Sequence, residues 1–247
     1  MALDRDTAFT WLGHAALQIT TPGGKTILVD PWLSNPKSPV TIDEIDRCDI
    51  LLLTHGHFDH MGSGGSDILP IAARFSPTWP MIHEMSLWAG RRLPGGMDAV
   101  IGMNAGGTVD VGGIKVTMTP AIHSAGDWNA QGETTLYLGE AVGFVIEMEN
   151  GFRVYDLGDT DVFGDLALIG EMHRPDLAIL PIGGHYTMGP RAAAKAIELL
   201  GVKHVLPVHY GTFPILTGSP DELRVELDSR GLRDVEIHAL QPGETLH

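Results

Sequence analysis

Short apolar blocks separated by turn residues form the main pattern at the start of the chain. Residues 9–12, 17–20 and 26–30 read as three strands, and the Thr-Pro-Gly-Gly-Lys turn at residues 21–25 suggests an antiparallel meander. Residues 50–53 are four consecutive aliphatic side chains, a pattern typical of a strand buried on both faces. The first part of the chain therefore predicts a sheet that contains one fully buried strand.

Strands and helices alternate through the rest of the chain. The expected helices cover residues 68–74, 84–92, 190–200 and 221–229, after a capped helical turn at residues 41–44. The expected strands cover residues 81–83, 100–103, 107–111, 114–119, 142–148, 152–157, 177–181, 204–208 and 235–240. The polar stretch 124–142 is expected to be a long surface loop that could act as a lid. Similar element orders in both halves predict an α/β fold, a four-layer αββα sandwich forming one domain over residues 1–247.

The composition indicates a folded chain with an acidic surface. Of the 247 residues 43% are hydrophobic, and the formal net charge is −15 with no Lys/Arg cluster, which disfavours nucleic acid as a partner. Residues 1–6 lack the basic start of a signal peptide, and no apolar run approaches the roughly 20 residues of a membrane span. The single cysteine, Cys48, excludes an intrachain disulfide and is expected to be a buried thiol. These features favour a cytoplasmic protein.

The candidate chemistry lies directly after the buried strand, in the Thr-His-Gly-His-Phe-Asp-His sequence at residues 54–60. His55, His57, Asp59 and His60 offer imidazole nitrogen and carboxylate oxygen, the ligands that suit borderline divalent metals. The carboxyl end of a buried strand is where open α/β sheets hold their sites. A merely solvated histidine cluster in this position is improbable, so the run predicts half of a two-metal site.

Three further residues of ligand type follow apolar strands: His123, Asp159 and His209. We assign His55, His57 and His123 to a first metal, Asp59, His60 and His209 to a second, and Asp159 to a bridging position. Water held between the ions would lose a proton near neutral pH and attack a carbonyl carbon or phosphorus. Asp59 would orient this hydroxide and receive its proton. Taken alone, His123 or His209 would more often be a structural histidine, and Asp159 a turn residue or helix cap.

Other polar residues at strand ends can be interpreted in more than one way. His14 and His185 lie in glycine-flanked bends, where each could face substrate, support a metal ligand or simply be buried. Asp30 could accept a hydrogen bond from a ligand histidine or cap the turn at Pro31. We treat His173, His204, His238 and His247 as surface or packing residues.

The motifs around these residues resemble the metallo-β-lactamase superfamily. The resemblance is carried by residues 10–16, 27–31, 53–60, 121–124, 157–160, 180–190 and 208–214. Within the superfamily the chain resembles a branch of poorly characterised bacterial and archaeal metal-dependent hydrolases, related to the ascorbate phosphate lactonases. The similarity runs from Phe9 to about Gly243.

This resemblance implies the αββα sandwich, the two-metal site and the ligand roles assigned above. It also makes His185 a candidate catalytic residue of the cleft, beside Asp59. The branch usually has an acidic residue before that histidine, and here the position is Gly184. The zinc-dependent β-lactamases use a cysteine where this chain has Asp159, so antibiotic hydrolysis is not the favoured activity. The resemblance hints at self-association into a homo-oligomer.

The sequence favours a binuclear hydrolase acting on a small ester, lactone or phosphoester. Zinc is the first expectation for the two metals, although these ligands do not separate it from manganese, iron or nickel. The same site filled with iron could instead perform redox chemistry. A nuclease of the superfamily is disfavoured by the acidic charge, and a metal-bound sensor is disfavoured by the complete ligand set.

Overall fold

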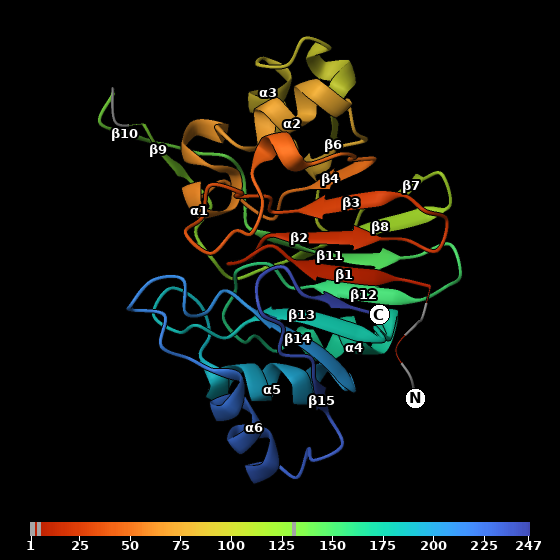
Figure 1. Cartoon of the computed structure of the whole chain (residues 1–247), viewed down its shortest axis with the longest axis vertical. Helices are drawn as coiled ribbons and strands as arrows, with labels where there is room; N and C mark the ends of the chain where they lie inside the picture. Colours follow the sequence, from red (N-terminus) through yellow and green to blue (C-terminus); the bar gives the residue numbers. More distant parts are fainter. Residues whose placement is uncertain (1–2, 4–5, 130–131) are drawn as a thin grey trace.

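The computed structural model describes residues 3, 6–129 and 132–247. Two sheets lie face to face in the middle of the molecule (Figure 1). The first sheet has the strand order β16-β1-β2-β3-β4. Its strands are β1 (Ala8–Trp11), β2 (Leu17–Thr20), β3 (Thr26–Val29), β4 (Ile50–Leu52) and β16 (Thr245–Leu246). β1, β2 and β3 pair as the expected antiparallel meander, and β3 pairs with β4 in parallel.

The second sheet has seven strands in the order β15-β14-β13-β12-β11-β8-β7. They are β7 (Thr108–Val111), β8 (Ile114–Pro120), β11 (Val142–Glu147), β12 (Arg153–Asp156), β13 (Leu177–Pro181), β14 (His204–Val208) and β15 (Glu236–Ile237). β12 to β15 run parallel, and β8 has the same direction because β11 is antiparallel to both β8 and β12. The carboxyl ends of β8, β12 and β14 therefore lie at one edge.

Helices gather at the two ends of the molecule (Figure 1). They are α1 (Phe58–Met61), α2 (Ile68–Phe75), α3 (His83–Gly90), α4 (Leu166–His173), α5 (Pro190–Leu200) and α6 (Pro220–Ser229), with short 3-10 turns η1 (Ile42–Glu44), η2 (Ser63–Gly65) and η3 (Gly96–Ala99). A small parallel pair, β5 (Pro80–Ile82) and β6 (Ile101–Met103), accompanies α2 and α3.

Two apolar cores separate the layers. One fills the space between the sheets and continues to α2 and α3, with residues such as Ile19, Leu52 and Phe144 fully buried. The other lies between the second sheet and helices α4 to α6, with Ala178 and Ile197 among its members. Because β13 in the middle of the second sheet is covered by apolar residues on both faces, it reads as a continuous hydrophobic run. The expected αββα sandwich is confirmed, and the single-domain boundary stays a prediction.

Several elements differ from the expectation. α4 was not predicted, because Gly170 interrupts the apolar pattern of this helix. The position is glycine because a side chain there would collide with the backbone oxygen of Leu200. The stretch 124–142 is not irregular throughout, since β9 (Asp127–Asn129) and β10 (Thr134–Leu136) form a hairpin. Residues 130–131 of that stretch lie outside the described part of the chain, as do four of the first six residues, on which the expectation about a signal peptide rests.

The strand expected at residues 235–240 is shorter, because β15 is an edge strand with only two residue pairs to β14. Of the helices in the described residues, none combines the length and apolarity needed to cross a bilayer.

Cys48 is buried, with 4% of its surface exposed, and its thiol donates to the backbone oxygen of Ile50. Burial raises the pKa of the thiol to about 12. The thiolate fraction at pH 8 is then roughly 1000-fold below that of an ordinary cysteine. We expect iodoacetamide to alkylate the native protein at least 100-fold more slowly than the urea-unfolded protein, as followed by mass spectrometry. Equal rates would contradict a structural role for this thiol.

Candidate metal centre

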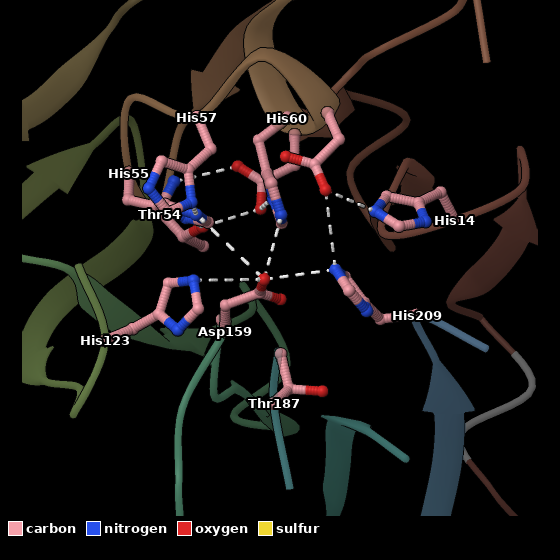
Figure 2. Close-up of polar contacts among 12 residues, drawn as sticks. His14, Thr54, His55, His57, His60, His123, Asp159, Thr187 and His209 are labelled. Atoms are coloured by element: carbon pink, nitrogen blue, oxygen red, sulfur yellow. Dashed lines mark hydrogen bonds and ion pairs between the residues drawn. The ribbon is translucent and has the colours of Figure 1, made fainter. Parts of the chain in front are cut away.

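Segments from both sheets bring their polar ends to one edge of the sandwich. β4 leads to Thr54 and His55, and the following turn leads into α1, which carries Asp59 and His60. From the second sheet, β8, β12 and β14 are followed by His123, Asp159 and His209, respectively. The bend between β1 and β2 adds His14 (Figure 2).

The structure brings all seven predicted metal ligands together at this edge. His55, His57 and His123 form one group, with 2.9 Å between His55 Nε2 and His57 Nδ1. Asp59, His60 and His209 form a second group that also contains His14. Nε2 of His14 lies 3.1 Å from Asp59 Oδ2, and Nε2 of His209 lies 3.8 Å from the same oxygen.

Asp159 lies between the two groups (Figure 2). Its Oδ2 is 3.2 Å from His60 Nε2, 3.1 Å from His209 Nε2, 3.6 Å from His123 Nε2 and 4.0 Å from His55 Nε2. One carboxylate oxygen thus faces nitrogens from both groups, which suits a residue shared by two cations.

The donor atoms fit divalent metal ions. Nε2 of His60 and Nε2 of His209 are buried, and neither has a hydrogen-bond partner among the described residues, although both lie near Asp159. A buried nitrogen without a partner is costly. A cation that accepts both lone pairs would remove this cost, and nitrogen with oxygen is a donor set that zinc and neighbouring metals bind.

Asp30 fixes the orientation of two histidines among the candidate ligands. Its Oδ2 accepts hydrogen bonds from Nδ1 of His60 and from the hydroxyl of Thr54, each at 2.7 Å. Because the Thr54 hydroxyl donates to Asp30, its oxygen is left to accept from Nδ1 of His55 at 3.0 Å. Both histidines therefore carry their proton on Nδ1, which leaves the Nε2 lone pairs facing the centre.

His14 is held in a similar way and is completely buried. Its Nδ1 lies 2.9 Å from the hydroxyl oxygen of Thr212, and its backbone oxygen accepts from the amide of His209. His14, Asp30 and His209 all adopt left-handed backbone conformations, with φ of 52°, 44° and 55°. Such conformations cost of order 1 kcal/mol or more each in side chains other than glycine, and they cluster at functional sites.

The charges of the centre are strongly coupled. Burial raises the pKa of Asp159, but the opposite effect of His209 and His60 is larger, so the pKa lies well below its usual value. Burial lowers the pKa of His209, but Asp159 outweighs this effect and brings it to about 9. Burial lowers the pKa of His123 and of His14 to about 4 each. Burial also acts to lower the pKa of His60, but Asp159 outweighs this effect and raises it. Without a metal, His60 and His209 are therefore protonated beside the Asp159 carboxylate, whereas His123 and His14 are neutral. Metal binding would displace these two protons from His60 and His209.

His185 lies apart from this cluster. Its side chain is exposed on the loop after β13, in edge contact with the ring of Tyr186, and its ring nitrogens belong to neither ligand group. Its catalytic role stays a prediction. Two residues with clear contacts were not singled out from the sequence, Thr54 and Thr212. The signal for Thr54 was its place directly before the histidine run, and Thr212 had none.

A cleft of about 650 Å³ opens onto the centre. Its walls include the candidate ligands His57, Asp59, His123 and Asp159, so a small molecule can reach these side chains. Phe58, Trp128, Tyr186, Phe213 and Ile215 supply apolar surface around them.

Comparisons with known proteins agree with this geometry. A family model described as Beta-lactamase superfamily domain matches residues 25–210. A UPF0173 metal-dependent hydrolase of Rubrobacter xylanophilus is 46% identical over 241 residues, covering 97% of this chain and 96% of that protein. A metallo hydrolase from the archaeon Ignicoccus hospitalis superposes with a TM-score of 0.83 at 34% identity, covering 97% of each chain.

A more distant match shows the fold alone. A diiron β-hydroxylase from Streptomyces venezuelae superposes with a TM-score of 0.70 at 20% identity, covering 98% of this chain and 54% of that one. The family expected from the motifs is confirmed by the closer matches. The chain belongs to the metallo-β-lactamase superfamily and is a metal-dependent hydrolase.

Proposed function

We propose that this protein is a binuclear hydrolase whose substrate is a small, uncharged ester or lactone with an apolar group. The observation that carries the binuclear centre is the position of Asp159, whose single oxygen faces nitrogens of two separate ligand groups. A divalent metal pair held by these ligands would supply Lewis acidity and a water of lowered pKa.

Asp59 is the residue of this chain best placed to orient the attacking water. It lines the cleft, and its Oδ2 is held by Nε2 of His14, which Thr212 supports from the other side. Burial raises the pKa of Asp59, but His14 and His209 lower it further, to a value well below the usual range. A carboxylate with such a low pKa accepts a proton only transiently. We therefore assign Asp59 to orientation and proton relay rather than to proton storage.

The charge of the cleft supports an uncharged substrate. Among the described residues that line it, Asp59, Asp127 and Asp159 are acidic, and none is lysine or arginine. Beyond the metal ions themselves, enzymes that bind phosphate groups usually add cationic side chains or clustered amides. Trp128 and Tyr186 are each 60% exposed at the rim, where they offer flat surface to an aromatic or acyl group. A phosphoester is therefore the less favoured substrate.

Metal content and activity test the binuclear assignment together. Protein purified without chelator or metal resin is expected to hold about two metal equivalents by elemental mass spectrometry. Removing them by chelation should abolish ester hydrolysis, and adding zinc or manganese should restore it. Full activity in metal-free protein would refute the proposal. Two equivalents of iron with oxygen consumption would instead favour redox chemistry.

A substrate panel tests the uncharged class. We expect p-nitrophenyl butyrate to give a higher kcat/KM than p-nitrophenyl phosphate. Trp128→Ala should raise KM for the ester by up to about tenfold, the upper range for one aromatic contact. Tyr137→Ala is the matched control, because Tyr137 is 63% exposed and does not line the cleft. A preference for the phosphate ester would overturn the substrate class but leave the metal centre intact.

A cytoplasmic location and a homo-oligomeric state stay predictions from the sequence.

A further inference from the structure

A second group of metal-ligating side chains lies at the other end of β14. His204 begins this strand, whereas His209 of the catalytic centre follows its last residue. Five residue steps of about 3.3 Å each place the two histidines roughly 16 Å apart along the strand. The second group is therefore separate from the site described above.

The strand register brings three of these side chains to one face. His204 pairs with Glu236 across the parallel β14–β15 ladder, and paired residues point to the same side of a sheet. His238 lies two residues beyond Glu236, and its amide still donates to the backbone oxygen of Val205, so the extended path continues. The intervening residues, Val205 and Ile237, pack against the helices on the opposite face.

The ligand atoms have the spacing of a coordination shell. Nδ1 of His204 is 3.1 Å from Nε2 of His238 and 3.5 Å from Oε2 of Glu236. In a tetrahedral zinc site with bonds of about 2.0–2.1 Å, neighbouring ligand atoms lie roughly 3.3–3.4 Å apart. All three atoms lie within 4.8 Å of one another. A single cation can therefore reach them with small adjustments of side chains that are partly exposed.

The surroundings leave Glu236 available for a cation. Among the described residues, no lysine or arginine pairs with it: Lys203 pairs with Asp234, and Arg224 pairs with Asp228. The Glu236 side chain is 63% exposed, whereas that of His204 is 13% exposed. Burial lowers the pKa of His238, which favours the neutral imidazole that a metal requires. The competing interpretation is a simple hydrogen bond between the two imidazoles, with no ion.

We propose that His204, Glu236 and His238 bind one borderline divalent cation of the zinc, nickel or cobalt class, independently of catalysis. The ligand set of two imidazoles and one carboxylate selects this class over magnesium or calcium, which prefer oxygen ligands. The cation would join β15 to β14. β15 consists of only two residues and forms an edge of the second sheet, so its backbone hydrogen bonds to β14 hold it only weakly. The site therefore has a structural role in holding the C-terminal segment.

Calorimetry with zinc alone tests this site on protein whose catalytic centre is already filled. We expect one further binding event per chain. His238→Gln and Glu236→Gln should each lower the zinc affinity of this event by at least about tenfold. Loss of a residue that merely supports a metal ligand already has an effect of that size, and loss of a ligand should have a larger one. His173→Gln is the matched control, because His173 is a partly exposed histidine of α4 outside the group. Ester hydrolysis should stay unchanged in all three variants.

Thermal unfolding gives a second measurement. Zinc should raise the Tm of the wild-type protein with a filled catalytic centre, and the increase should shrink in Glu236→Gln, since a cation that binds only the folded state stabilises it. Glu236 is exposed, so this variant is expected to fold. Absence of a further binding event, or an event of equal strength in both variants, would show that the two histidines form only a hydrogen bond.

Discussion

Replacing Asp159 by asparagine is expected to lower kcat/KM by more than about 100-fold, the upper end for residues that merely support a metal ligand. The same variant should lose about one metal equivalent per chain. Asp159 is buried, and its Oδ2 lies within 4.0 Å of Nε2 in His55, His60, His123 and His209. No other carboxylate in the described residues faces both ligand groups.

The reason is charge as well as geometry. An asparagine keeps the volume of the side chain but brings no negative charge between two divalent ions. Without that charge the repulsion between the ions is less well offset in a low-dielectric site. If its amide nitrogen took the place of Oδ2, it would also direct hydrogens, rather than a lone pair, at the ions.

Elemental mass spectrometry and steady-state kinetics on the same preparation check this prediction. Asp161→Asn is the matched control: Asp161 lies on the same loop but is exposed, and its side chain only accepts from the amide of Val162. The control should retain both metals and full activity. Two retained equivalents with normal kcat/KM in Asp159→Asn would exclude a bridging role.

The grouping of the candidate ligands at one edge could be predicted from the sequence because their signals are local. Each of His123, Asp159 and His209 follows an apolar strand, and parallel strands of one sheet bring their carboxyl ends to the same edge. The run from His55 to His60 follows β4 in the same way. Side-chain type and position after a strand were therefore sufficient to place these residues together.

For Asp30 and His14, support of a candidate ligand could be predicted from the sequence only as one of two or more interpretations, because it depends on contacts between distant segments. His14 meets Asp59 and Thr212, residues 45 and 198 positions away along the chain. The left-handed backbone of His14 and Asp30 has only a weak sequence signal, since histidine and aspartate adopt it more often than most residues but far less readily than glycine. α4 was missed for a related reason. Gly170 allows the close approach of α5, whose last residue is Leu200, and this contact is visible only in the folded structure.

Asp30→Asn is expected to lower affinity for the metal bound by His60 by about 10- to 100-fold, the usual effect of changing a residue that orients a ligand histidine. Asp30 Oδ2 accepts from Nδ1 of His60 and from the Thr54 hydroxyl, while Oδ1 accepts from the Thr54 amide. All three partners donate, so the position requires an acceptor at both oxygens.

An asparagine can satisfy only part of this pattern. If its oxygen faces the Thr54 amide, its NH₂ group faces Nδ1 of His60. The imidazole must then accept at Nδ1 and carry its proton on Nε2, which removes the lone pair that faces the metal. If the amide is flipped, its NH₂ group meets the Thr54 N–H, and two donors are left opposed. Either orientation weakens the site without altering a ligand.

Competition with a chromogenic chelator measures this affinity directly, and Asp46→Asn, which changes an exposed carboxylate near β4, is the control. Excess metal should restore activity to Asp30→Asn more completely than to Asp159→Asn. The Asp30 variant keeps every proposed ligand and changes only the free energy needed for His60 to carry its proton on Nδ1. A general loss of stability would instead lower activity at all metal concentrations. Equal affinities in Asp30→Asn and the wild type would mean that His60 binds metal through a tautomer that Asp30 does not select.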